Sequence, residues 1–221
     1  MLYSLLCWFK IKLYYCNPLK LQTQLTQRMG QFGTYFQLGY EHILDIAGYD
    51  HILFVVALCA IYQIQDWKKI LILVTAFTIG HSITLALSTL ELISFRSDII
   101  EFLIPVTIFI TAFTNLLKRH SSAPKKLNSN YFFALFFGLI HGLGFSNYLK
   151  SLLGREQSIL TPLLAFNLGL ELGQILIVLF FIVTSFVFVG LFNVSKRDWL
   201  LVISSAVAGI AITMMIETKF W

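Results

Sequence analysis

The stretch KILILVTAFTIGHSITLALSTLE, residues 69–91, decides the fold of this chain. It is apolar over at least the ~20 residues that an α-helix needs to cross a bilayer. Near its middle it contains a histidine, His81. An ionisable side chain at that depth costs roughly 2.5–3.5 kcal/mol on insertion scales, so it is a functional candidate by default. The stretch therefore predicts a membrane helix that carries part of a functional site.

Five more apolar segments predict an all-α, polytopic membrane bundle of about six transmembrane helices. The composition agrees, because 57% of the residues are hydrophobic and only 12% are charged, whereas a soluble domain carries about 25% charge. The alternating ten-residue pattern of a β-barrel is absent from the sequence. The fifth segment is long enough to tilt, or to break near Gly169 or Gly173. The predicted segments are residues 40–64, 69–91, 98–118, 130–152, 160–193 and 199–217.

Residues 1–28 differ from the rest of the chain. Their apolar beginning is too short to span a bilayer, is soon interrupted by Lys10 and Lys12, and lacks a small-residue cleavage site. We interpret them as an N-terminal extension, either upstream of a natural start at Met29 or forming an interfacial arm. Residues 29–221 are then a single transmembrane domain.

The loops carry the orientation signal. Eight basic residues lie on one side of the predicted bundle and four on the other, and the side with eight is expected to face the cytoplasm. Residues 1–28 contain four more basic residues, which would make the two sides equal at eight each. The predicted orientation therefore holds only if residues 1–28 are left out of the count. We predict a bacterial inner (plasma) membrane protein with both termini outside, and with the lipid bilayer rather than nucleic acid as its partner. The eight residues are Lys68, Lys69, Lys118, Arg119, Lys125, Lys126, Lys196 and Arg197.

Ionisable residues of three segments fall at matched depth. His81 and His141 lie 11–12 residues from the inner ends of their segments, and Glu171 lies about 11 from the outer end of its own, which is roughly 17–18 Å for each. Asp50 and His51 lie above them, in the outer part of the first segment. This agreement in depth predicts one shared site. Imidazoles and carboxylates without a thiol cluster suit a divalent transition metal such as nickel, cobalt, zinc, manganese or iron.

Other polar residues share faces with this group. His42 and Asp45 are three residues apart near the outer mouth, where the ion would enter. Such neighbours fit partners that orient ligating imidazoles. Hydrogen bonding between helices is an equal alternative for any single histidine and the favoured one for Asn167 and Gln174. His120 is expected in a solvated loop. The predicted metal residues are His51, His81, His141, Asp50, Glu171 and His42, supported by Asp45, Thr78, Ser82, Asn167 and Gln174.

Four blocks of the chain resemble the HupE/UreJ family of small membrane proteins, which are regarded as nickel or cobalt permeases. The resemblance covers about residues 35–215. It implies a role in handling the metal ion for Asp50, His51, His81, His141 and Glu171. It departs in the third segment, where Thr114-Asn115 stands in place of a Glu-Asn pair and Pro105 is expected to kink the helix. The matching blocks are GYDHILF (48–54), VTAFTIGHSITL (74–85), FGLIHGLGFS (137–146) and FNLGLELGQ (166–174).

The resemblance favours transport over catalysis, with nickel or cobalt as the first expectation for the cargo. The sequence contains no Walker motif, so ATP is not the expected direct energy source. One rival reading is a membrane metalloenzyme whose histidines and Glu171 hold a catalytic zinc or iron with an open position. Another is a metal-independent bundle in which the histidines only join helices. The oligomeric state is left open by these features.

Overall fold

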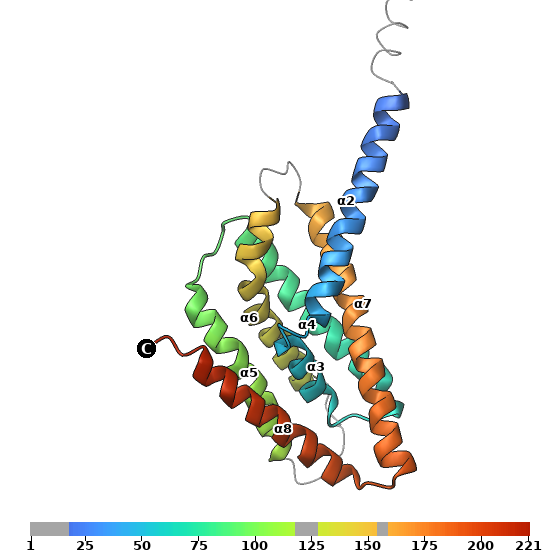
Figure 1. Cartoon of the computed structure of the whole chain (residues 1–221), viewed down its shortest axis with the longest axis vertical. Coiled ribbons are helices and arrows are strands. Elements are labelled where there is room, and N and C mark those ends of the chain that lie inside the picture. Colours follow the sequence, from blue (N-terminus) through green and yellow to red (C-terminus); the bar gives the residue numbers. More distant parts are fainter. Residues whose placement is uncertain (1–17, 118–127, 154–158) are drawn as a thin grey trace, which may run out of the picture.

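The computed structural model describes residues 18–117, 128–153 and 159–221, and these residues form helices without a β-strand (Figure 1). The predicted all-α fold is thereby confirmed. The elements are α2 (Pro18–Leu44), α3 (Asp50–Cys59), the 3-10 turn η1 (Ile64–Asp66), α4 (Trp67–Thr89), α5 (Ser97–Leu116), α6 (Asn128–Leu153), α7 (Leu160–Ser185), the π-helical η2 (Phe186–Leu191) and α8 (Lys196–Glu217).

Five of the described helices are long and apolar enough to cross a membrane, so this is an integral membrane protein. They are α4 with η1, then α5, α6, α7 with η2, and α8. Their bounds agree closely with five of the six predicted segments. The fifth segment does not break at either glycine; its irregular part is η2, at its C-terminal end. α5 continues through Pro105 to Leu116.

The first predicted segment, 40–64, is not one continuous span. The chain leaves the helical conformation after Leu44 and resumes it only at Asp50. In the gap, a carboxylate oxygen of Asp45 accepts a hydrogen bond from the backbone N–H of Ala47 at 2.8 Å, a local alternative to helical bonding that aspartate favours. The following helix, α3, has ten residues, which is about 15 Å and half a bilayer.

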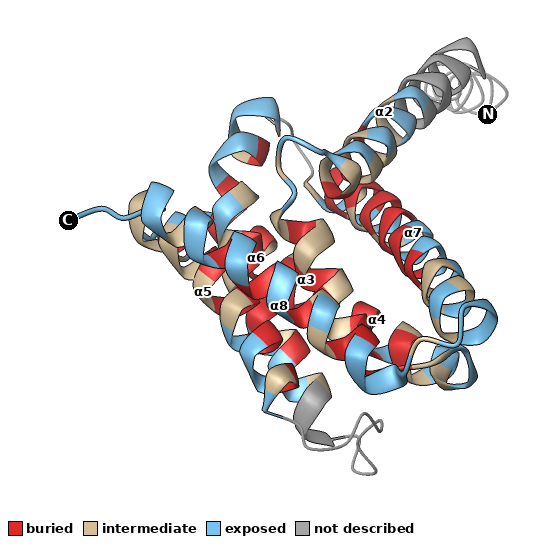
Figure 2. Cartoon of the chain, turned by 60° about the horizontal axis from the view of Figure 1, so that its bottom comes forward, coloured by how far each residue is buried: buried red, intermediate tan, exposed pale blue. Residues whose placement is uncertain are grey.

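The short α3 lies inside the bundle, between α5, α7 and α8, and its N-terminal end meets α2. Figure 2 shows buried residues concentrated on α3 and on the faces of α4 and α6 behind it, while the outer face of α8 is exposed. A broken helix of this kind is tolerated in a membrane where the irregular backbone is enclosed by protein or lines a cavity.

Two pairs of parallel helices make their closest contact through glycines. In the α4–α6 pair, a Cβ on Gly80 would overlap the carbonyl oxygen of Leu135, and one on Gly138 would overlap that of Phe77. In the α2–α7 pair, a Cβ on Gly169 would overlap the carbonyl oxygen of Phe36. Small residues permit this close approach where lipid gives helices little hydrophobic reason to associate.

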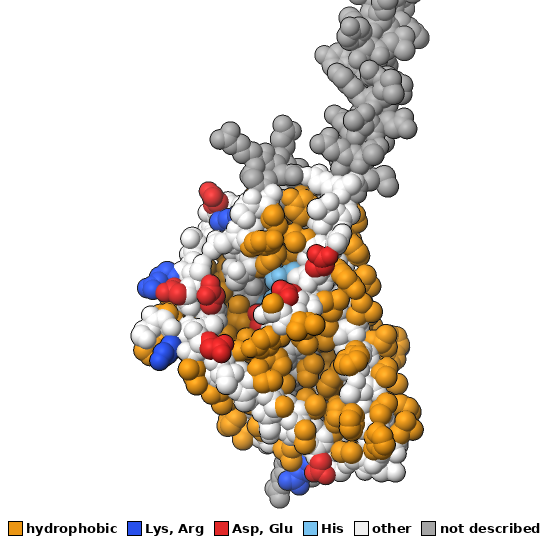
Figure 3. All heavy atoms as spheres, viewed as in Figure 1, with side chains coloured by type: hydrophobic (Ala, Val, Ile, Leu, Met, Phe, Trp, Pro, Cys, Tyr) orange, Lys and Arg blue, Asp and Glu red, His pale blue; other side chains and the backbone are white. Residues whose placement is uncertain are grey.

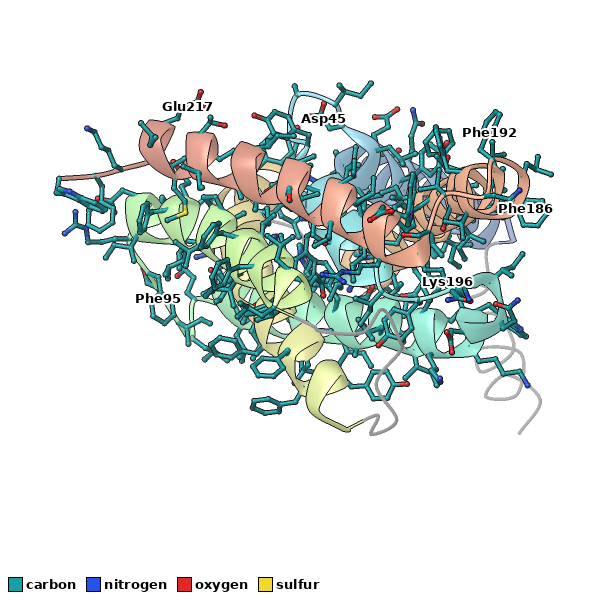
Figure 4. The ribbon with its side chains drawn as sticks, turned by 90° about the horizontal axis from the view of Figure 1, so that it is seen from below. Asp45, Phe95, Phe186, Phe192, Lys196 and Glu217 are labelled. Carbon is teal, nitrogen blue, oxygen red and sulfur yellow. The ribbon has the colours of Figure 1, made fainter. Side chains whose placement is uncertain are left out.

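The two ends of the bundle can be told apart by the residues that they carry. Figure 4 shows Lys196 with Phe186 and Phe192 at one end, and Glu217 with Phe95 at the other. Lys69, near the start of α4, pairs with Asp66 at 2.7 Å in the connection that precedes it. α4 and α8 both begin at the Lys196 end, and their first turns carry Lys68, Lys69, Lys196 and Arg197. We therefore call it the basic end of the bundle.

The glycine contacts lead to a stability prediction. We expect Gly138→Ala to lower the free energy of unfolding by about 1–3 kcal/mol, since a Cβ there forces two backbones apart. The shift in unfolding temperature would be about 2–4 °C per kcal/mol for a chain of this size.

Gly209→Ala is the matched control, because a Cβ on Gly209 has nothing within 4 Å. Thermal unfolding of both variants in the same detergent is the measurement. Equal unfolding temperatures would show that the α4–α6 contact tolerates an additional methyl group.

Candidate metal site

Four histidines from four helices meet inside the bundle. The ring centre of His51 lies 4.7 Å from that of His42, 5.3 Å from that of His141 and 6.0 Å from that of His81. His42 and His81 are 6.2 Å apart. His81 has no exposed surface, and His51 and His141 are buried as well. The structure therefore brings together the three histidines at the centre of the sequence-based prediction and adds His42 to them.

The local structure of each helix explains this meeting. His51 is in the first turn of α3, directly after the break, so it projects from the start of a helix at mid-bundle. His81 and His141 come from the glycine-packed pair α4 and α6. A Cβ on Gly142, next to His141, would overlap the backbone oxygen of His81. The contact that packs these two helices therefore also sets the distance between their imidazoles.

Two of the imidazoles have one ring nitrogen fixed by a hydrogen bond. Nδ1 of His51 lies 3.0 Å from a carboxylate oxygen of Asp50, and Nδ1 of His141 lies 2.9 Å from the backbone oxygen of Phe137. Both oxygens are acceptors, so each Nδ1 carries the proton and each Nε2 keeps its lone pair in the neutral imidazole. Metal-binding histidines are oriented in this way by a carboxylate or carbonyl.

The remaining nitrogens of the cluster are buried without a protein partner. They are Nε2 of His42, His51 and His141, and both Nδ1 and Nε2 of His81. A buried polar group without a partner costs about 1–3 kcal/mol. Five such atoms in one place need an ion or water to satisfy them, and the Nε2 lone pairs of His51 and His141 suit a cation.

The distances between the four imidazole rings are close to those of a metal site, but not all of them match. Two imidazoles that bind one ion at about 2.1 Å have ring centres about 5 Å apart. His42, His51 and His141 approach this spacing around His51, whereas His81 is farther from it. Within the described ranges, no three His, Cys, Asp or Glu side chains are already placed to hold one ion. Binding therefore requires small rotations of these side chains.

A cavity of about 460 Å³ reaches the cluster at His42, and its lining also includes Glu41 of α2, Asp45 just after α2, and Tyr148 of α6. We call it the mouth. Figure 3 shows a hollow in which histidine is visible beneath acidic side chains. Tyr148 lies towards the C-terminal end of α6, so the mouth opens away from the basic end. Negative charge at an opening raises the local concentration of cations.

Glu171 is placed apart from the imidazoles. Its carboxylate accepts a 2.6 Å hydrogen bond from the hydroxyl of Thr75, and Thr75 precedes His81 on α4 by six residues, or about 9 Å. Next to it, the Thr78 hydroxyl donates to the side-chain oxygen of Gln174 at 2.7 Å. These bonds join α4 to α7, on the side of His81 nearer the basic end.

The other predicted supporting residues have separate positions. The hydroxyl of Ser82 bonds to the backbone oxygen of Thr78, within its own helix. Asp45 is exposed at the mouth. Asn167 has a buried side-chain oxygen without a hydrogen-bond partner. His120 falls outside the described residues. None of the three described residues, Ser82, Asp45 and Asn167, is bonded to a histidine of the cluster.

Two features of the site were not predicted from the sequence: the aromatic rings around His42, and a six-residue motif that occurs twice. The His42 ring packs on Phe145, with ring centres 3.9 Å apart, and lies near Phe166. The signal for linking His42 to His51 was present: residues 39–44 read Gly-Tyr-Glu-His-Ile-Leu and residues 48–53 read Gly-Tyr-Asp-His-Ile-Leu. The break between these copies turns one repeated motif into two neighbouring imidazoles.

The fold and the site define an integral membrane helical bundle with a buried histidine cluster below an acidic mouth. A family model described as "HupE / UreJ protein" matches residues 19–219, and the chain belongs to this family. No curated protein and no solved structure matches the chain. Family membership implies a membrane protein with a metal-related accessory or transport role.

The bond between Asp50 and His51 leads to a test of the site. We expect Asp50→Asn to weaken divalent-metal binding about 10–100-fold, because loss of a carboxylate that orients a ligating histidine has an effect of that size. Calorimetric titration with nickel and cobalt is the measurement. Asp66→Asn is the control, since Asp66 pairs with Lys69 away from the cluster. An unchanged affinity in Asp50→Asn would mean that the carboxylate does not act on a ligand.

Proposed function

We propose that the protein is a permease for a divalent transition metal ion, nickel or cobalt first, and that the histidine cluster is its transport site. The observation that carries the proposal is the set of five buried, unpartnered imidazole nitrogens in a cluster that an acidic mouth reaches at His42. Membership of the HupE/UreJ family supports a metal-related role in the membrane.

The proposed path starts at the mouth. Glu41 and Asp45 attract a hydrated cation, which then reaches His42 at the wall of the cavity. There it exchanges water for imidazole nitrogens, first those of His42 and His51 and then those of His81 and His141. Asp50, hydrogen-bonded to His51, supplies a negative charge beside the ion without filling a coordination position.

The donor chemistry supports the proposed choice of metal. Neutral imidazole suits nickel, cobalt and zinc, and thiolates would favour Cu(I). The described free cysteine, Cys59, is buried and lines a different, much smaller cavity with Gln174. The site would therefore offer nitrogen donors and a carboxylate rather than sulfur. Because ligation requires neutral imidazole, metal binding would also compete with protons.

Glu171 keeps a role in the proposal as a later contact of the ion. From His81 the ion would move about 9 Å along α4, towards the basic end, to reach the level of Thr75 and Glu171. We further propose that the basic end faces the cytoplasm of a bacterial inner membrane, with both chain ends outside. The basic connections support this orientation through the positive-inside rule.

Transport can be tested directly in proteoliposomes. We expect uptake of nickel or cobalt by the unaltered chain, and at least a tenfold loss of uptake in His51→Ala and His81→Ala, because each removes a nitrogen donor at the centre of the cluster. His120→Ala is the matched control and is expected to keep its uptake. Normal uptake in both cluster variants would refute the proposal.

Elemental analysis of the purified protein separates transport from catalysis. A permease site should exchange its metal on dialysis against a chelator, because conduction requires that the ion can leave. Added nickel at 100 times its dissociation constant should then stabilise the protein by about 2.7 kcal/mol. A tight, stoichiometric zinc or iron would favour the metalloenzyme instead. Absence of any metal effect on unfolding would favour the metal-independent bundle.

A further inference from the structure

A second cavity, of about 290 Å³, lies on the other side of the histidine cluster from the mouth. It is lined by α3, the residues that follow α3, and α4, α5 and α6, and one of its walls is formed by Thr111, Thr114 and Asn115 of α5. Its lining also includes Leu73, near the start of α4, and Phe133, near the start of α6. Both of these helices begin at the basic end, so the cavity lies in that half of the bundle.

One layer of aromatic rings separates this cavity from the cluster. Phe54 packs against Phe77 and Phe137, with ring centres 5.0 and 5.6 Å apart. On the cluster side, the rings of Phe54 and Phe77 each lie 5.2 Å from that of His141. On the opposite side, Phe137 is part of the cavity wall. All three phenylalanines are buried.

We propose that this second cavity is the inner vestibule of the permeation path, and that Phe54, Phe77 and Phe137 form its closed gate. The identity of the ion rests on the proposed function, whereas the cavity and the barrier stand on the geometry alone. An apolar constriction of this kind excludes a hydrated ion because the ion would lose its water without gaining a ligand. The structure is thus open at the mouth and closed towards the vestibule.

The short helix α3 connects the binding site to the gate. His51 and Phe54 are three residues apart and share one face of it. A tilt or rotation of α3 therefore moves a metal ligand and a gate residue together. The other end of α3 is held by Asn115, whose side-chain N–H donates to the backbone oxygen of Ala57 at 2.7 Å. This bond fixes α3 to α5 in the closed arrangement.

Thiol accessibility tests the vestibule. Thr114→Cys lines the cavity, while Phe113→Cys is its neighbour on α5 but is not part of the lining. Each variant is exposed, in vesicles of known orientation, to a charged, membrane-impermeant methanethiosulfonate, and peptide mass spectrometry resolves the site from the native cysteines. We expect Thr114→Cys to react at least tenfold faster than Phe113→Cys, and only from the basic end. If Thr114→Cys does not fold, Thr111→Cys, one turn nearer the barrier, replaces it.

The gate is tested with a small thiol-reactive cation, Ag⁺, added on the mouth side only. In Thr114→Cys the reaction is expected to be slow, and adding Phe54→Ala should accelerate it at least tenfold by opening the aromatic layer. Phe54→Leu, which stays apolar and fills more of the space, should give a smaller increase and serves if the alanine variant does not fold. An unchanged rate in both variants would overturn the assignment of the gate.

The outcomes separate this inference from the proposed function. Thiol labelling needs neither nickel nor cobalt. A reactive Thr114→Cys, together with no metal uptake by the unaltered chain, therefore refutes the permease and leaves a water-filled cavity that is closed from the mouth. Metal uptake together with a Thr114→Cys that is unreactive from both sides refutes the vestibule, and shows a cavity that is dry or filled by lipid. Equal reaction from both sides in the presence of Phe54 refutes the barrier.

Discussion

The contact between the backbones of α4 and α6 is the constraint on which the site depends. Gly80, Gly138 and Gly142 leave no space for a Cβ between the two helices, so these helices cannot be spaced by larger side chains without separating His81 from His141. In a soluble protein the hydrophobic effect would also hold the two helices together. In lipid, where apolar side chains gain little by leaving the solvent, close packing is a main source of association. The packing contact and the candidate metal site therefore involve the same turns of α4 and α6.

Much of the fold was predictable because lipid restricts what a chain can do. Backbone groups in hydrocarbon must be satisfied within the segment, so a long apolar stretch such as residues 69–91 has almost no alternative to a helix. His81 and His141 lie at one level, next to the α4–α6 contact, because a straight helix converts position in the sequence into height. Height alone does not say which way a side chain points around its helix axis. Glu171, at a similar predicted height, lies beside Thr75 rather than beside an imidazole.

The break between α2 and α3 was not predicted, although its residues were in view. Hydropathy averages over a window, and the five residues between Leu44 and Asp50 are too few to lower it. The partners of the histidines were also beyond sequence reasoning. Asp50 could be expected beside His51, but the acceptor for His141 is a backbone oxygen, which every residue has, and only the structure shows that Phe137 supplies it. The three phenylalanines below the cluster could not be told apart in the sequence from the other 18 of the chain's 21 phenylalanines.

The beginning of α3 at Asp50 has an electrostatic consequence for how long an ion stays. The N-terminal end of a helix carries roughly half a positive charge, and here that end lies among the histidines. A cation in the cluster is therefore repelled by the helix that presents His51, and the carboxylate of Asp50 offsets this repulsion. Four imidazoles around one ion would otherwise make a site that holds its metal for a long time. In the proposed permease, the opposing dipole would favour release of the ion over long retention.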